Sequence, residues 1–242
     1  MLKCEISDIR GFRDLVNVTD KIVDEIRFTC DSEGLRYSAL DRGHISFITA
    51  NLDKTFFYTY QCDEPETLTV DSGELLNVLK RGKSDDILSI SHDESNLVLV
   101  FDGEAKRRFR IRLIDAEYDN PTPPSIDYPA EVEVGFKDWY ESLKDCELYS
   151  DKVTIKGSDD KLIVCGVGDK GSYEASLQIL DGLVDGAYKS TFSLDHVKKL
   201  SSVSGSGLLL CFGNDMPLLL KCSDELNGLE LGFLIAPRIE RD

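Results

Sequence analysis

The sequence predicts an α+β fold of two similar halves, each with two units of one helix followed by antiparallel strands. Four segments have the 3.6-residue apolar spacing of amphipathic helices, and strand-like runs follow each of them. The helix starts recur about every 60 residues, which is the mark of an internally duplicated architecture. A proline-rich stretch separates the second unit from the third. We therefore expect four repeated units in two halves.

The predicted helices cover residues 9–21, 71–83, 136–148 and 193–203. Ser7 or Asp8 is expected to cap the first, and Asp71 with Ser72 to open the second, because short polar side chains accept the free N–H groups of a first turn. The apolar faces contain Ile9, Phe12, Val16 and Thr19 in the first helix, Leu75, Val78 and Leu79 in the second, Phe136, Trp139, Tyr140 and Leu143 in the third, and Leu194, Val197 and Leu200 in the fourth.

Apolar or alternating runs after each helix predict strands at 25–30 and 34–40, 87–91 and 96–101, 152–157 and 161–167, and 207–212 and 216–222. Glycines at 166–168, 205–207 and 228 are expected in turns. The basic run at 106–112 permits two readings. It is either a localisation or nucleic-acid patch, or a charged edge strand in which Phe109, Ile111 and Leu113 alternate with arginines. We favour the edge strand.

Residues 115–129 hold four of the seven prolines and are predicted to be neither helix nor central strand. This connector divides the chain into an N-terminal domain, 1–114, and a C-terminal domain, 130–242. Its composition alone leaves open whether it is a passive linker or a docking surface, since extended proline segments form both.

The net charge of -17 argues at first against a nucleic-acid partner. The four predicted helices, however, contain ten basic and nine acidic residues, so the remaining residues carry -18. Cations near helix C-termini are favoured by the helix dipole, so ordinary solvated faces are one interpretation. The other is a weakly attractive, sequence-independent track for phosphates, formed if all four helices line one surface.

Catalytic, metal and cofactor motifs are absent from the sequence. The seven cysteines have no C-x-x-C spacing and predict free buried thiols in a reducing compartment. Asp85 with Asp86 and Asp159 with Asp160 follow turn patterns and predict solvated loop carboxylates. No apolar run is long enough to span a membrane, so we expect an intracellular protein, in the cytoplasm or nucleoid or in the nucleus.

Four segments carry a family resemblance: LDRGHISFI at 40–48, the connector after LID at 113–115, NDMPLLL at 214–220 and FLIAPRIE at 233–240. The chain resembles the proliferating cell nuclear antigen family, particularly its archaeal members, over essentially its whole length. The resemblance implies a DNA-clamp fold, with helices on the face of a channel and sheets outside, and a homotrimeric ring around double-stranded DNA. It implies no catalytic activity, and partners that include a clamp loader, DNA polymerase, flap endonuclease and DNA ligase.

Residue roles follow from the resemblance by matching position. The DNA channel would use Arg10, Arg13, Lys80, Lys83, Lys144, Lys198 and Lys199, although Asp14 and Asp20 stand where the family has basic residues. The client pocket would use Leu40, His44, Ile45, Phe47, Pro124, Ile126, Pro217, Leu234, Ala236, Pro237 and Ile239, which favours a docking role for the connector. The subunit contact would pair Phe109, Arg110 and Ile111 with Tyr173, Glu174 and Ser176 of a neighbour.

Two rival hypotheses remain at this point. The acidic charge fits a monomeric clamp-like scaffold that binds proteins without encircling DNA. An enzyme that uses a pair of carboxylates is the second rival, and it would need Asp85 or Asp159 for turnover.

Overall fold

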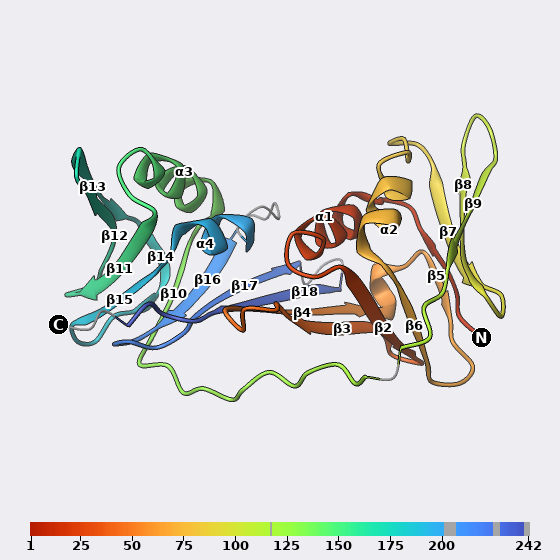
Figure 1. Ribbon diagram of the computed structural model, residues 1–242, viewed down its shortest axis with the longest axis horizontal. Coiled ribbons are helices and arrows are strands. Elements are labelled where there is room, and N and C mark those ends of the chain that lie inside the picture. Colours follow the sequence, from red (N-terminus) through yellow and green to blue (C-terminus); the bar gives the residue numbers. More distant parts are fainter. Residues whose placement is uncertain (117, 201–206, 225–227, 240–242) are drawn as a thin grey trace. The chain divides into compact units, whose positions relative to one another are not determined.

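The structure is a computed structural model that describes residues 1–116, 118–200, 207–224 and 228–239 (Figure 1). The chain divides into two compact units. Unit 1 contains Met1–Leu40, Ile48–Pro123 and Asp224–Leu231, and unit 2 contains Asp41–Phe47, Pro124–Ser223 and Gly232–Asp242. Residues 41–47 thus belong to unit 2, although the segments on both sides of them belong to unit 1. Residues 224–231 belong to unit 1, although the segments on both sides of them belong to unit 2. The predicted domain boundaries at 114 and 130 stay predictions.

Unit 1 contains two helices and two antiparallel sheet regions. In chain order its elements are β1 (Lys3–Ile6), α1 (Arg10–Thr19), β2 (Glu25–Asp31), β3 (Gly34–Leu40), β4 (Ser46–Asp53), the 3-10 helix η1 (Lys54–Phe56), β5 (Thr59–Gln61), β6 (Glu66–Asp71), α2 (Ser72–Leu79), β7 (Ile87–His92), β8 (Asn96–Asp102) and β9 (Arg107–Arg112). One sheet has the order β5-β1-β7-β8-β9, and β4-β3-β2-β6 follow one another in a second. The first two residues of β4 belong to unit 2.

Unit 2 repeats this plan. Its elements are β10 (Ala130–Gly135), α3 (Phe136–Glu147), β11 (Lys152–Ser158), β12 (Lys161–Gly168), β13 (Gly171–Leu177), β14 (Ile179–Leu183), β15 (Tyr188–Ser193), α4 (Leu194–Leu200), β16 (Gly207–Phe212), β17 (Leu218–Asp224) and β18 (Leu229–Ile235). One sheet has the order β13-β12-β11-β15, and β14-β10-β16-β17-β18 follow one another in the other. The first three residues of β18 belong to unit 1.

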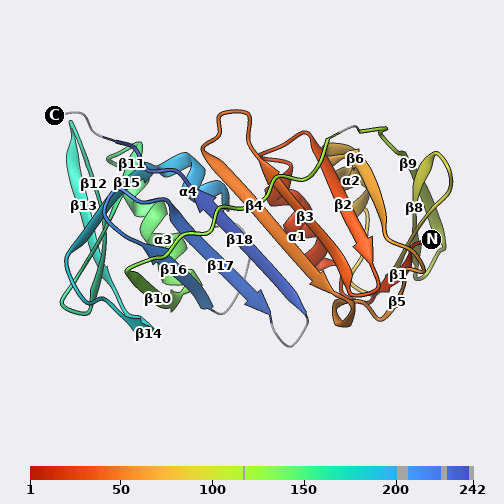
Figure 2. The ribbon, with the colours of Figure 1, turned by 90° about the horizontal axis from the view of Figure 1, so that it is seen from below.

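In each unit the two helices lie on one face of the strands (Figures 1 and 2). The predicted apolar faces explain this position. Phe12 and Val16 of α1 and Trp139 and Leu143 of α3 are at most 2% exposed. Thr19 is also fully buried, and its hydroxyl donates to the carbonyl of Leu15 while it shares a short hydrogen bond with the Tyr37 hydroxyl. Helices and sheets are thus held together by apolar side chains at helical spacing.

The four predicted helices are confirmed, with ends one to four residues shorter in the described residues. Residues 201–203 of the fourth prediction lie outside the described part, as do 205 and 206 of one predicted turn. Asp71 accepts the backbone N–H of Glu74 at 2.7 Å and caps α2 as predicted. The N-cap residue of α1 is Ile9, which makes no side-chain cap hydrogen bond, so the predicted cap at Ser7 or Asp8 is wrong; Asp8 instead accepts the backbone N–H of Arg10 at 3.0 Å. The described residues between 113 and 129 contain no helix or strand, as predicted.

The predicted strands are confirmed, and β9 is the edge strand of its sheet. Phe109 and Ile111 are more buried than the exposed arginines between them, so the alternation is that of a half-buried edge. Strands that the sequence reading did not include are β1, β4, β5, β6, β10, β14, β15 and β18.

Candidate interaction surfaces

The loop between β3 and β4, together with the first residue of β4, is called the Asp41 loop (residues 41–46) and presents Arg42, His44 and Ile45 to solvent. One carboxylate oxygen of Asp41 accepts the backbone N–H groups of Ile45 and Ser46, each at 2.7 Å. The N–H of Asp41 donates to the carbonyl of Ser46 at 2.9 Å, and His44 has a left-handed φ of 55°. Aspartate closes turns by accepting such backbone groups. The loop is therefore fixed while His44 and Ile45 remain exposed.

The C-terminal segment runs alongside this loop. The backbone N–H of Ala236 donates to the carbonyl of Ile45 at 2.8 Å, and that of Arg238 to the carbonyl of Thr191 at 2.7 Å. Arg238 also forms an ion pair with Asp151 at 3.2 Å. The segment after β18 is thus held between the Asp41 loop and β15, all within unit 2.

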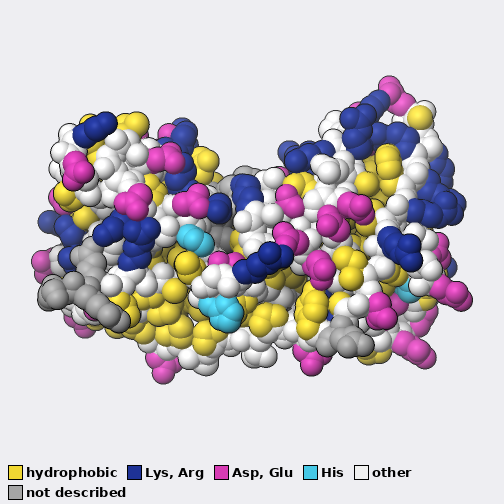
Figure 3. Space-filling view, in the orientation of Figure 1, with side chains coloured by type: hydrophobic (Ala, Val, Ile, Leu, Met, Phe, Trp, Pro, Cys, Tyr) yellow, Lys and Arg dark blue, Asp and Glu magenta, His cyan; other side chains and the backbone are white. Residues whose placement is uncertain are grey.

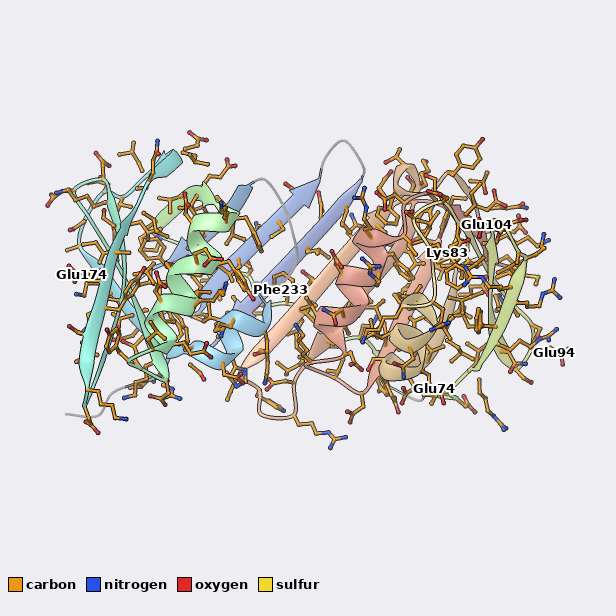
Figure 4. The ribbon with its side chains drawn as sticks, turned by 90° about the horizontal axis from the view of Figure 1, so that it is seen from above. Glu74, Lys83, Glu94, Glu104, Glu174 and Phe233 are labelled. Atoms are coloured by element: carbon orange, nitrogen blue, oxygen red, sulfur yellow. The ribbon has the colours of Figure 1, made fainter. Side chains whose placement is uncertain are left out.

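Side chains of this segment alternate in exposure. Phe233, which Figure 4 labels in β18, and Ile235 are fully buried, whereas Leu234 between them is half-buried. Ala236 and Pro237 are half-buried, and Ile239 is 76% exposed. Figure 3 shows hydrophobic side chains gathered where Figure 1 draws this C-terminal segment. The segment therefore offers apolar surface next to the exposed loop.

The remaining residues of the predicted pocket differ in their exposure. Pro124 is exposed, and Ile126 and Pro217 are half-buried; all three belong to unit 2 with the loop and the C-terminal segment. Leu40 is half-buried at the end of β3, in unit 1. Phe47 is only 7% exposed, so it lies in the core beneath the surface and is not itself a contact residue. The prediction of Phe47 as a pocket wall is therefore corrected, and the other pocket residues stay a prediction.

The first part of the connector is attached to unit 1. Arg27 donates to the carbonyl of Ala116 at 2.6 Å and lies 5.5 Å from the ring centroid of Tyr118. The Asn120 side chain donates to the carbonyl of Arg27 at 2.9 Å, and Ser38 donates to the carbonyl of Pro121 at 2.6 Å. Backbone polar groups outside regular structure need such partners. This part of the connector is therefore bound to the β2 and β3 strands.

Nearly all of the predicted channel cations have an acidic partner. The pairs are Arg10 with Asp8 at 2.5 Å, Arg13 with Asp14 at 3.8 Å, Lys83 with Glu104 at 2.8 Å, Lys144 with Glu141 at 3.1 Å, Lys198 with Glu147, and Lys199 with Asp195 at 2.6 Å. Lys80 is exposed at the C-terminus of α2 and has no ion-pair partner among the described residues. The charge of the helices is thus largely compensated locally.

The two acids at unexpected positions have different local roles. Asp14 forms a weak pair with Arg13, at 3.8 Å. Asp20, at the end of α1, accepts a hydrogen bond from the hydroxyl of Ser72 at 3.0 Å, and Ser72 also donates to the carbonyl of Val23. Asp20 therefore connects α1 to the start of α2, which is a reason for an acid at this position.

Two unpaired edge strands carry side chains of opposite charge. β9 ends the five-stranded sheet of unit 1, and β13 ends the four-stranded sheet of unit 2. On β9 the Arg110 side chain is 56% exposed, and Figure 3 shows Lys and Arg side chains gathered over β8 and β9. On β13 the Glu174 side chain, labelled in Figure 4, is 63% exposed, Ser176 is exposed and Tyr173 is half-buried.

One expected turn carboxylate is not solvated. Asp86 is 3% exposed, accepts the backbone N–H of Lys83 at 2.7 Å and forms a short ion pair with Arg107. Arg107 also donates to the carbonyl of Arg81 at 2.7 Å. The prediction of a solvated Asp86 is therefore wrong, because Arg107 and the turn after α2 enclose the carboxylate. Asp85 is exposed, as predicted.

The cysteines are all buried and unbridged, as predicted. Burial raises the pKa of the Cys4 thiol and of the Cys222 thiol to about 12, so both are protonated and unreactive near neutral pH. Among the described residues, no group of His, Cys, Asp and Glu could hold a metal ion. The described helices include none that is long and apolar enough to cross a membrane.

Comparisons with known proteins agree with this architecture. Residues 1–121 match the family described as proliferating cell nuclear antigen, N-terminal domain. The chain is 40% identical to the DNA polymerase sliding clamp of Methanothermobacter thermautotrophicus, with 100% of both proteins covered. A PCNA crystal structure from Thermococcus kodakaraensis is similar with a TM-score of 0.93 at 26% identity, over 98% of this chain and 100% of that one.

A second solved structure is the PCNA of A. fulgidus bound to the C-terminal region of FEN-1. It is similar over 100% of both chains, with a TM-score of 0.92 at 22% identity, and so supports the fold. The DNA-clamp fold and the predicted family are confirmed by these similarities. The chain belongs to the proliferating cell nuclear antigen family, the sliding clamps of DNA polymerase.

Proposed function

We propose that three copies of this chain close into a ring around duplex DNA. The observation that carries the proposal is that β9, with exposed arginines, ends a sheet of unit 1, and that β13, with the exposed Glu174, ends a sheet of unit 2. Pairing of two different surfaces of one protein is heterologous, and such contacts form rings when the rotation closes. Unpaired strand edges readily accept another chain.

Apolar side chains next to β13 support this contact. Leu148 at the end of α3 is 74% exposed, Tyr149 is 41% exposed and Val167 of β12 is 76% exposed. Val167 pairs with Ser172 of β13, and the Tyr149 ring lies against Gly171 at the start of β13. Leu148 precedes Tyr149 in the chain. Exposed apolar groups that cluster on one surface mark interaction sites. A neighbouring subunit that covers β13 would also cover them.

The four helices would face DNA with little net attraction. The helices and the residues beside them carry Lys and Arg side chains, but most of these form ion pairs with Asp or Glu of the same chain. Exposed ion pairs contribute little energy and leave part of the cation's field available to phosphates. We infer that the ring holds DNA mainly by enclosing it, while the helix charges centre the duplex.

Client proteins would dock on unit 2, over the Asp41 loop and the C-terminal segment. Ile45 and Ile239 supply exposed apolar side chains there, and Pro124 of the connector is exposed in the same unit. A short peptide with apolar anchors would bind such a surface, since a few anchors usually dominate affinity. By family membership we expect polymerase, flap endonuclease, ligase and clamp loader as partners, and a role without catalysis.

Retention on DNA tests the proposal. The chain is loaded onto closed circular DNA by its clamp loader, and the bound fraction is followed before and after one restriction cut. We expect the protein to stay on circles and to leave within minutes of linearisation, because a ring slides off free ends. Equal retention on circular and linear DNA would contradict encirclement, and absence of binding to either would favour the monomeric scaffold.

A further inference from the structure

A side-chain hydrogen bond joins the proposed client surface to a helix of the proposed channel. The hydroxyl of Ser46, the last residue of the Asp41 loop, lies 2.7 Å from Nδ1 of His196 on α4. Ser46 is 2% exposed and His196 is half-buried. Both residues belong to unit 2. The contact joins two segments that are 150 residues apart in the chain.

The Asp41 loop has hydrogen bonds within itself and with the rest of unit 2. Within the loop, the Asp41 carboxylate holds the N–H groups of Ile45 and Ser46. From outside, the carbonyl of Ile45 accepts the N–H of Ala236, and the next residue contacts His196. These two adjacent contacts hold the Ile45–Ser46 end of the loop against the rest of unit 2. A buried hydroxyl without its partner must move or remain desolvated at a cost in free energy.

We propose that His196 is a positioning residue that fixes the Asp41 loop in the conformation that receives client peptides. The inference rests on the proposed docking function. His196 does not need to touch the peptide, since it acts through Ser46 on the exposed Ile45. The same helix carries Lys198 and Lys199, which pair with Glu147 and Asp195. The loop is thereby tied to the helix that we assign to the DNA channel.

Peptide affinity of the full-length protein tests this inference. The probe is a peptide that copies the C-terminal region of FEN-1, measured by calorimetry. We expect His196→Ala to weaken binding about fivefold, the effect of one neutral hydrogen bond of ordinary strength. His196→Asn is expected to restore most of the affinity, because its amide presents polar atoms close to the position of Nδ1. Ser142→Ala, which removes another buried hydroxyl of unit 2, is the matched control and should bind like the wild type.

A double-mutant cycle isolates the hydrogen bond. If the Ser46–His196 pair is responsible, adding Ser46→Ala to His196→Ala will weaken binding no further, whereas independent roles would give additive effects. Hydrogen exchange gives a second readout without peptide. The amides of Ile45 and Ser46 should exchange faster in His196→Ala, while those of β16 keep their protection.

The outcomes separate the inference from the function on which it rests. Unchanged affinity and unchanged exchange in His196→Ala, with Ile45→Ala still weakening the peptide, would overturn the positioning role alone. A wild-type protein that does not bind the peptide would overturn the docking surface, and with it the client part of the inference. Failure of His196→Asn to restore either readout would also count against the hydrogen bond.

Discussion

A buried carboxylate in unit 1 connects a proposed channel helix to a proposed subunit edge. Asp86 accepts the N–H of Lys83 in the turn after α2 and pairs with Arg107 at the start of β9. Gly103 lies against it, and a side chain at that position would clash with its carboxylate oxygen at 2.2 Å. The carboxylate thus positions both the end of the helix and the beginning of the edge strand.

Removal of this carboxylate is expected to destabilise the protein. In Asp86→Ala the Arg107 guanidinium, 26% exposed, and the Lys83 amide lose their partner. We expect the free energy of unfolding to fall by about 2–4 kcal/mol. This is at the lower end of the range for breaking a buried ion pair, because the Arg107 side chain is partly exposed to solvent. Urea denaturation followed by circular dichroism measures it.

Asp85→Ala is the matched control. It removes the same side chain from the neighbouring exposed position, so its stability should stay within about 0.5 kcal/mol of the wild type. Equal effects of the two substitutions would mean that the Asp86–Arg107 ion pair does not stabilise the fold.

Elements with local signals could be predicted from the sequence. The helices follow from apolar spacing, and the cap of α2 follows from Asp71, which lies three residues before the backbone N–H that it accepts. The edge position of β9 follows from its alternating arginines. Each of these features is decided within a dozen residues, where periodicity and capping are strongest.

Features that depend on distant partners could not be predicted. Ser-Asp-Asp at 84–86 gives no sign that Arg107 encloses one aspartate and not the other. No strand was predicted at 229–235, where Phe233 and Ile235 belong to β18, because the pairing of this strand is not encoded locally. Ser46 and His196 were likewise not paired. The D-x-x-H pattern of the Asp41 loop did carry a turn signal that could have identified the Asp41 hydrogen bonds.

Among the predicted channel cations, Lys80, the C-cap residue of α2, has the greatest freedom to meet phosphates. Lys80 is exposed without an ion pair among the described residues, whereas Lys144 of α3 is paired with Glu141, which also raises the pKa of Lys144. A cation that already has an acid partner releases fewer counterions when it approaches DNA. The helices should therefore differ in how strongly they attract the duplex.

We expect Lys80→Ala to reduce the salt dependence of DNA binding more than Lys144→Ala does. The measurement is fluorescence anisotropy with a short linear duplex, which can thread into a ring, at several salt concentrations. The slope of log affinity against log salt should fall by about 1 for each phosphate that is no longer neutralised in Lys80→Ala, and by less in Lys144→Ala. Equal slopes for both variants and the wild type would show that Lys80 does not neutralise a DNA phosphate.

At the scale of the whole molecule, the charge of -17 would repel DNA at long range if it were uniform. Most of the acid lies outside the predicted helices, and the helix cations are balanced by nearby acids. Such a protein gains little affinity for DNA from attraction to its phosphates. A closed ring around DNA does not need that attraction to stay bound. In the proposed ring, assembly of the subunits, more than attraction to phosphates, would decide whether the protein stays on DNA.

The edge-strand contact predicts how assembly responds to charge reversal. Arg110→Glu would place an acid opposite Glu174 of a neighbour, and Glu174→Arg would place two cations together; like charges across an interface cost several kcal/mol. Each single variant should fall from a trimer of about 81 kDa, three times 27.1 kDa, toward one subunit in light scattering at micromolar concentration. The double variant should recover the trimer, because the pair is restored with its signs exchanged.

Arg36→Glu, the same reversal on the interior strand β3, should leave the mass unchanged. A wild-type mass near one subunit would refute the ring, and single variants that remain trimeric would show that this pair does not hold the interface.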